Sequence, residues 1–90
     1  IMNNKSWGAE KAYQRDFYNE RYIGADIKSP PFHKLAEIYG AKGYHVSQLE
    51  DLKQAVSDAL ICDKPAIINI DVDPKALYSF RKDSFKHRSK

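Results

Sequence analysis

The sequence predicts an α/β fold: the C-terminal portion of a doubly wound, mainly parallel sheet that this chain contains only in part. The run at 66–72 is β-branched and almost continuously apolar over its first half, which is typical of a strand covered on both faces. Helical patterns alternate with short strand patterns, as in right-handed crossover units. Only about three strands are expected, and the edges of so small a sheet would be exposed. We therefore expect the remaining strands of the sheet to lie outside these 90 residues.

The composition is that of one small globular domain. The chain has 90 residues, of which 42% are apolar and 30% charged. Apolar runs fall short of the about 20 residues that a membrane span needs, and a secretory signal pattern is absent. The single cysteine, Cys62, excludes an internal disulfide and a cysteine-based zinc site. We therefore expect a cytoplasmic protein without a membrane partner.

The first half of the chain predicts a strand end and two helices. Residues 1–4 end a strand, and aromatic and apolar residues at helical spacing predict a helix over 8–22. Ser29 followed by two prolines predicts the start of a second helix, with the serine hydroxyl as the cap and a proline at the first helical position. This helix carries an apolar face from Phe32 to Tyr39. Gly40 is suited to the left-handed end of that helix.

The second half predicts a strand, a helix and another strand. A short strand covers 43–46, and the capping-box pattern of Ser47 and Glu50 starts a helix that ends before Pro65. The strand at 66–72 follows and ends at Asp73-Pro74. Residues 75–86 are expected to form a final helix or an irregular arm.

The positive charge gathers at the C-terminal end. Residues 1–74 hold 9 basic and 11 acidic side chains, whereas residues 75–90 hold 6 basic side chains and 1 acidic one, for a net charge of +5. We interpret 75–90 as a basic C-terminal arm, either a solvated end or an anion site. The sequence has no nucleic-acid module signature, so no nucleic-acid partner is expected.

Two amides follow the first strand end. Asn3 and Asn4 would lie beyond the carboxyl end of a strand and just before a helix, where open α/β sheets bind ligands and helix amides attract anions. An amide oxygen suits Mg²⁺ in a diphosphate complex, because the diphosphate already supplies negative charge. Taken alone, the pair is more simply a turn after a strand.

Longer motifs surround this pair. They are NNKSWGAEK at 3–11, FHKLAE at 32–37, GAKGY at 40–44 and PAIINIDVDP at 65–74. Together they resemble the C-terminal domain of the thiamine-diphosphate enzymes, in the acetolactate-synthase-like branch, over nearly the whole chain. Within that branch, residues 7–18 and FRKD at 80–83 are most similar to the sulfoacetaldehyde acetyltransferases.

The resemblance implies thiamine diphosphate and magnesium as cofactors. Asn4 matches a magnesium ligand through its side-chain oxygen, and Ser6 matches a ligand through its backbone carbonyl. Gly8 and Ala9 match the cofactor-binding start of a helix. Glu10 and Tyr13 match positions that border the substrate pocket.

The resemblance also implies parts that this chain lacks. A Gly-Asp-Gly element precedes the asparagine pair in the family, and another domain supplies an activating glutamate; the 90 residues hold neither. We therefore expect residues 1–90 to be a C-terminal fragment of the cofactor-binding domain, with no catalytic residue of its own and no activity alone. The remainder of the enzyme chain and further copies of it, in a homo-oligomer, are the expected partners.

The implied reaction converts sulfoacetaldehyde and phosphate to acetyl phosphate and sulfite. Both substrates are anions, and Arg81 is the candidate to hold one of them, since its planar guanidinium offers paired donors to a sulfonate or a phosphate. A role of Arg81 in solubility or a subunit contact is the alternative. An acetolactate synthase, or a related 2-keto acid decarboxylase or lyase, is the alternative enzyme, and a small binding module with a basic arm is the alternative of another class.

Overall fold

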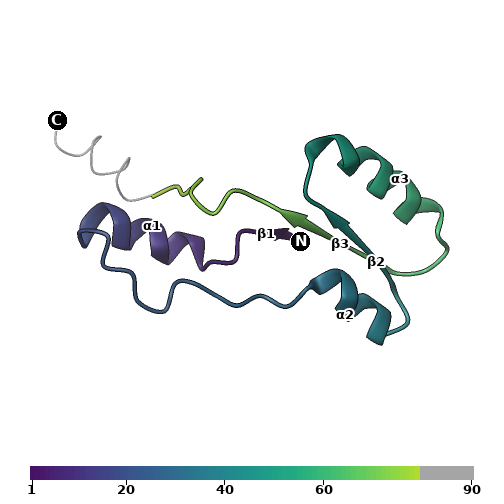
Figure 1. Ribbon diagram of the computed structural model, residues 1–90, viewed down its shortest axis with the longest axis horizontal. Coiled ribbons are helices and arrows are strands. Elements are labelled where there is room, and N and C mark those ends of the chain that lie inside the picture. The colour runs from purple at the N-terminus through teal and green to yellow at the C-terminus, as the bar shows by residue number, and fades with distance from the viewer. Residues whose placement is uncertain (80–90) are drawn as a thin grey trace. The chain divides into compact units, whose positions relative to one another are not determined.

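A computed structural model describes residues 1–79 and divides the chain into two units. The first unit comprises residues 1–4 and 29–72, and the second comprises residues 5–28 with those that follow Val72. The first unit holds β1 (Met2–Asn3), α2 (Phe32–Ile38), β2 (Lys42–Val46), the 3₁₀ helix η1 (Leu49–Asp51), α3 (Leu52–Ile61) and β3 (Ala66–Asp71) (Figure 1). The second unit is built around α1 (Gly8–Phe17).

The first unit is built on a parallel sheet in the order β1-β3-β2. The β-branched run forms β3, the central strand, which confirms the sequence prediction. β2 pairs with β3 from Lys42↔Ala66 to Val46↔Ile70. β1 pairs with the end of β3 through Met2↔Ile70 and Asn3↔Asp71. The parallel pairing and the helical crossovers are those of an α/β fold.

Helices α2 and α3 lie on opposite sides of this sheet (Figure 1). Gly43 of β2 faces α2 so closely that a Cβ atom there would stand 1.8 Å from the carbonyl oxygen of His33. Neighbouring residues of a strand point to opposite faces, and Tyr44 accordingly faces the end of α3. Burial, together with the nearby thiol of Cys62, raises the pKa of Tyr44. The doubly wound arrangement predicted from the sequence is therefore present.

Two predicted helix caps are wrong. Helix α2 starts at Phe32 with Pro31 in the cap position, where no side chain caps it, so Ser29 stands too early to serve. The capping box fails because the chain first forms η1, with Gln48 in the cap position and no side-chain cap. Ser47 instead donates its hydroxyl hydrogen to the Asp71 carboxylate, 3.2 Å away. Gly40, by contrast, has φ +73° as predicted.

The predicted helix over 8–22 is shorter in the structure. Helix α1 ends at Phe17, and Asn19 and Glu20 both adopt left-handed backbone conformations, with φ of 52° and 58°. Two such residues cannot continue a right-handed helix. The amide of Glu20 donates to the carbonyl of Gln14, which folds the chain back after the helix end. Of the predicted final helix over 75–86, residues 75–79 are irregular and the remainder lies outside the described residues.

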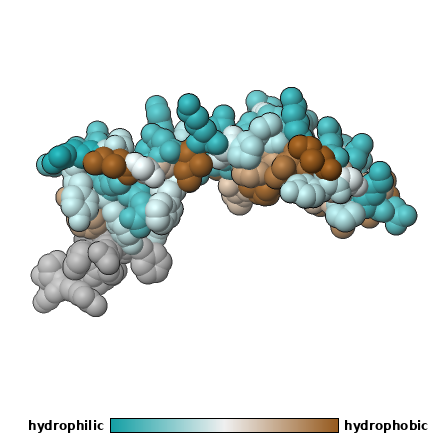
Figure 2. Space-filling view, turned by 90° about the horizontal axis from the view of Figure 1, so that it is seen from below, coloured by the Kyte–Doolittle hydropathy of each residue, from teal (hydrophilic) through white to brown (hydrophobic). Residues whose placement is uncertain are grey.

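The buried core of the described residues consists of small side chains, namely Ala12, Ala25, Ala36, Val46 and Ala55. No large side chain is fully buried among them, and many apolar ones are exposed. On the face shown in Figure 2, apolar residues reach the surface between hydrophilic ones. Met2, Ile38 and Leu60 are 76%, 78% and 81% exposed. Within residues 1–79, no helix has both the length and the apolar character needed to cross a bilayer.

Candidate functional site

The carboxyl end of β1 places Asn4 at the edge where parallel strands finish. The amide of Val72 donates to the carbonyl of Asn3 over 3.1 Å, so the pairing continues to the residue before Asn4. Asn3 is buried and Asn4 is half-buried. Open α/β sheets bind ligands at this edge, which is the location predicted for Asn4.

The chain bends sharply directly after Asn4. Lys5 has φ 55°, a left-handed conformation that costs a residue with a Cβ atom about 1 kcal/mol. Ser6 then forms an isolated antiparallel bridge with Asp26. The bridge hydrogen bonds come from the flanking residues: the amide of Trp7 donates to Ala25 over 2.7 Å, and the amide of Ile27 donates to Lys5 over 2.9 Å. This bridge fixes the backbone around Ser6.

The start of α1 presents amide hydrogens. Trp7 occupies the cap position without a side-chain cap, and the first helical hydrogen bond runs from the amide of Lys11 to the carbonyl of Trp7 over 3.0 Å. The amides of Gly8, Ala9 and Glu10 therefore precede the first hydrogen bond of the helix. Such a helix start favours a negatively charged group through its amides and the helix dipole.

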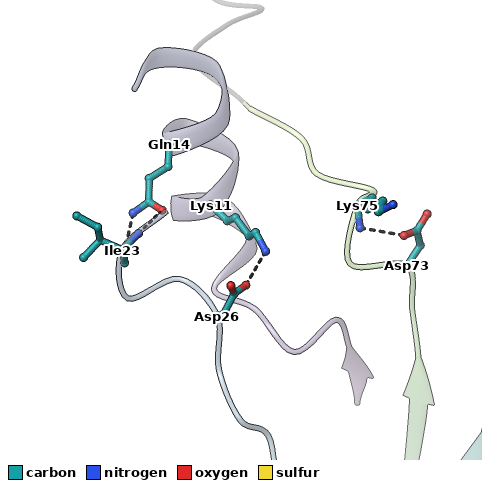
Figure 3. A network of polar contacts seen from close by, with 6 residues as sticks. All are labelled: Lys11, Gln14, Ile23, Asp26, Asp73 and Lys75. Carbon is teal, nitrogen blue, oxygen red and sulfur yellow. Dashed lines mark hydrogen bonds and ion pairs between the residues drawn. The ribbon is translucent and has the colours of Figure 1, made fainter. Parts of the chain in front are cut away.

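Polar side chains hold the returning segment against α1 (Figure 3). The Gln14 side chain makes two hydrogen bonds with the backbone of Ile23: its Nε2 donates to the carbonyl over 2.9 Å, and its Oε1 accepts from the amide over 3.1 Å. Lys11 forms an ion pair with Asp26 and lies over the ring of Tyr22, 5.0 Å from its centroid. These contacts hold the segment between the end of α1 and Asp26, the bridge partner of Ser6, against the helix.

Residues of α1 and of the segment after it form an open pocket with a volume of about 600 Å³. Its lining residues come from α1 and from the segment after it: Glu10, Tyr13, Gln14, Phe17, Tyr18, Asn19, Arg21 and Ile23. The structure thus brings together Glu10 and Tyr13, the two residues predicted to border a substrate pocket. The lining therefore combines charged, polar, aromatic and aliphatic residues.

Arg21 supplies positive charge to this pocket, and sequence analysis did not single it out. Arg21 is among the lining residues because the left-handed turn at Asn19 and Glu20 returns the chain toward α1. The predicted helix over 8–22 would have continued through Arg21, so the sequence offered no reason to place Arg21 in a pocket. The other arginine of this region, Arg15, is engaged elsewhere: it donates to Asp16 over 2.9 Å and to the carbonyl of Leu77 over 3.2 Å. Its hydrogen bond with Asp16 raises the pKa of Arg15.

Arg81, the predicted anion-binding residue, lies outside the described residues. The predicted metal ligands are Asn4, in the first unit, and Ser6, in the second. Their donors, an amide oxygen and a peptide carbonyl oxygen, are the hard oxygen ligands that Mg²⁺ prefers. Between Ile1 and Ser79, no group of three or more His, Cys, Asp or Glu side chains is placed to hold a metal. A magnesium ion bound through either donor would therefore need phosphate, water or other protein groups to complete its shell.

The amino-acid sequence is similar to those of known thiamine pyrophosphate enzymes. Residues 1–70 match the protein family described as "Thiamine pyrophosphate enzyme, C-terminal TPP binding domain". The chain is 34% identical to a sulfoacetaldehyde acetyltransferase of Castellaniella defragrans over 93% of its own length, and 30% identical to a probable acetolactate synthase large subunit of Methanococcus aeolicus over 88%. It is 44% identical to a 2-hydroxyacyl-CoA lyase of Oryza sativa subsp. japonica over 56%. It spans 15%, 13% and 9% of these relatives.

Proposed function

The chain belongs to the thiamine pyrophosphate enzymes, in the family of their C-terminal TPP-binding domain, and from this premise we propose that it serves a thiamine-diphosphate- and magnesium-dependent enzyme. The observation that carries the proposal is the position of Asn4. This residue directly follows a paired parallel strand and directly precedes the bend at Lys5. Its amide oxygen is a neutral donor at the sheet edge where α/β folds bind ligands.

We propose further that residues 1–90 work as the C-terminal part of a larger cofactor-binding domain. The small-residue core and the exposed apolar side chains of the described residues support this view, because such surfaces are normally covered. The relatives, of which the chain spans 15% or less, have ample length for the missing part. The basic arm at 75–90 and assembly into a homo-oligomer belong to the same proposal.

Each predicted site residue has a role in this proposal. The Asn4 side-chain oxygen and the Ser6 carbonyl would bind magnesium, and the amides of Gly8 and Ala9 would bind the diphosphate. When bound, thiamine diphosphate supplies carbanion stabilisation at a carbonyl carbon, chemistry that protein side chains cannot provide. The chain itself contributes orientation and a preorganised electrostatic environment.

For the reaction, we favour conversion of sulfoacetaldehyde and phosphate to acetyl phosphate and hydrogen sulfite. In this reaction the carbon–sulfur bond and the aldehyde carbon–hydrogen bond break and sulfite leaves. The carbon that carried sulfur gains a proton and becomes the methyl group, and a phosphate oxygen forms the new bond to the carbonyl carbon. The similarity to sulfoacetaldehyde acetyltransferase over 93% of the chain supports this choice. Arg21 in the pocket beside Glu10 and Tyr13 offers a cation for a sulfonate or a phosphate, and Arg81 remains a second candidate.

The runner-up reaction is that of an acetolactate synthase or a related lyase, whose names two further relatives carry. Assays of the complete enzyme separate the possibilities. Release of sulfite with formation of acetyl phosphate supports the favoured reaction. Formation of acetolactate from pyruvate, without sulfite release from sulfoacetaldehyde, contradicts it and supports the runner-up.

Removal of the proposed metal ligand tests the cofactor site. In the complete enzyme, Asn4→Ala should weaken binding of Mn²⁺ with thiamine diphosphate at least about tenfold, measured by calorimetry without substrate, because even supporting groups of a metal site contribute this much. Gln48→Ala, which removes an amide from an exposed position of the same unit, is the matched control and should leave the affinity unchanged. Equal affinities for Asn4→Ala and the parent enzyme would contradict the cofactor site.

A further inference from the structure

A polar side-chain network begins where the main-chain pairing of β2 and β3 stops. The last register pair of these strands is Val46↔Ile70. One residue further along β3, the Asp71 carboxylate continues the connection: its Oδ2 lies 2.8 Å from Nε2 of His45 and accepts from the hydroxyl of Ser47 over 3.2 Å. A carboxylate only accepts hydrogen bonds, so Nε2 of His45 carries the hydrogen.

The imidazole of His45 is itself held in place. The ring of His33 from α2 stacks on it, with centroids 4.7 Å apart and planes 4° apart. The Asn69 amide, from β3, lies 3.4 Å from Nδ1 of His33, and Asn69 is 3% exposed. The stack fixes the orientation of His45, and thereby the direction from which Asp71 is held. We call His45, Ser47 and Asp71 the strand clamp.

The other side of the clamped strand end carries β1. Asn3 is the register partner of Asp71, and the next residue along β3, Val72, donates its amide to the carbonyl of Asn3 over 3.1 Å. Asp71 and Val72 therefore join β2, through the strand clamp, to the last paired residue of β1. Asn4 is the next residue along the chain.

From this arrangement we propose that the strand clamp positions Asn4, so that His45, Ser47 and Asp71 are positioning residues for the magnesium ligand. The inference rests on the proposed function, because it takes Asn4 as a ligand. A metal ligand must be held to within about 0.5 Å, and residues behind it set that tolerance. Without the clamp, the end of β3 loses its side-chain tie to β2, and the backbone before Asn4 gains freedom.

The test measures metal binding directly, apart from turnover. In the complete enzyme with thiamine diphosphate and no substrate, Asp71→Ala should weaken Mn²⁺ binding, followed by electron paramagnetic resonance, about tenfold. Asp71→Asn keeps an acceptor oxygen for Ser47 and should recover most of this loss. Turnover at saturating metal should change less than the metal affinity does, because the role proposed for the clamp is to hold Asn4. Asp51→Ala, an exposed aspartate of the same unit, is the control and should not change the affinity.

The results separate this inference from the proposed function. If Asn4→Ala weakens Mn²⁺ binding but Asp71→Ala does not, the clamp is structural only and the inference fails while the cofactor site stands. If Asn4→Ala leaves the affinity unchanged, the proposed function itself fails. Should Asp71→Ala not fold, Ser47→Ala gives the same test at an exposed position, and unchanged Mn²⁺ affinity in that variant also overturns the inference.

Discussion

The two units of the chain are stabilised by different kinds of interaction. The first unit has a continuous parallel ladder between β2 and β3 and a helix on each side of the sheet. Among its described residues, the second unit has the helix α1, an isolated bridge at Ser6, and contacts made by single polar side chains such as Gln14 and Arg15. A ladder distributes its stability over many backbone groups, whereas the second unit depends on a few individual side chains.

This difference bears on the proposed site. The strand-end asparagine belongs to the unit with the ladder, whereas the pocket with Glu10, Tyr13 and Arg21 belongs to the unit whose described residues pair only in an isolated bridge. Regions with few supporting contacts open locally at low free energy, and binding segments are commonly found among them. Under the proposed function, metal binding would depend on sheet geometry, whereas substrate specificity would depend on the loop that Gln14 holds.

The largest expected effect lies in the first unit, at Gly43. Gly43→Ala places a Cβ atom 1.8 Å from the carbonyl oxygen of His33, and both atoms belong to backbone-anchored positions that cannot easily move. Overpacking commonly costs 1–3 kcal/mol, and a clash with backbone lies at the upper end, so we expect a loss of about 3 kcal/mol in the free energy of unfolding. Urea unfolding of the complete enzyme measures it.

Gly24→Ala in the second unit is the matched comparison. Gly24 has φ +64°, but an added Cβ atom would meet no atom within 4 Å. Only the left-handed backbone then opposes the substitution, at a cost of about 1 kcal/mol. Equal losses for the two variants would show that the close packing of α2 on β2 does not distinguish the first unit.

The order of the elements in the first unit could be predicted from the sequence. Parallel strands and amphipathic helices have periodic patterns, and the β-branched run at 66–72 correctly indicated a strand of a parallel sheet. The errors were in the caps. Ser29 and Ser47 have the right chemistry for caps, but the backbone reaches helical geometry only at Phe32 and Leu49. A side chain can cap a helix only from the residue directly before its first turn, and a hydrophobic pattern does not specify the start of a helix to the exact residue.

The pocket could be predicted only in part. Glu10 and Tyr13 were identified through a family resemblance, and the structure places both in the pocket lining. Arg21 was missed because the pattern of residues 8–22 conceals the helix end at Phe17. That end depends on the left-handed turn at 19–20 and on the Gln14 side chain reaching Ile23, which are contacts without periodicity.

An intermediate effect is expected at Gln14, in the second unit. Gln14→Ala removes both hydrogen bonds to the backbone of Ile23, and each hydrogen bond contributes about 1 kcal/mol. The amide of Ile23 should then exchange its hydrogen about tenfold faster or more, measured by hydrogen exchange of the complete enzyme. Gln54→Ala on α3, which loses an exposed contact with Asp58, should change exchange in the first unit very little. Unchanged protection of Ile23 in Gln14→Ala would contradict a loop held by this side chain.

The smallest effect is an alkaline one, confined to the first unit at Tyr44. Burial first, and the nearby Cys62 thiol second, raise the pKa of Tyr44 above the ordinary value of about 10. The folded state therefore keeps a proton that the unfolded state releases, so this contribution to stability is complete below pH 10 and is lost as the pH rises through the raised pKa.

Absorbance at 295 nm should show one phenol of the native enzyme that ionises at a higher pH than the others. Tyr44→Phe should remove this late ionisation and part of the fall in urea midpoint between pH 9 and pH 11. Tyr39→Phe changes a phenol that is 80% exposed in the same unit, so it should leave both the late ionisation and the fall in place. If the two variants behave alike, the environment of Tyr44 between β2 and α3 is no different from that of a solvent-exposed phenol.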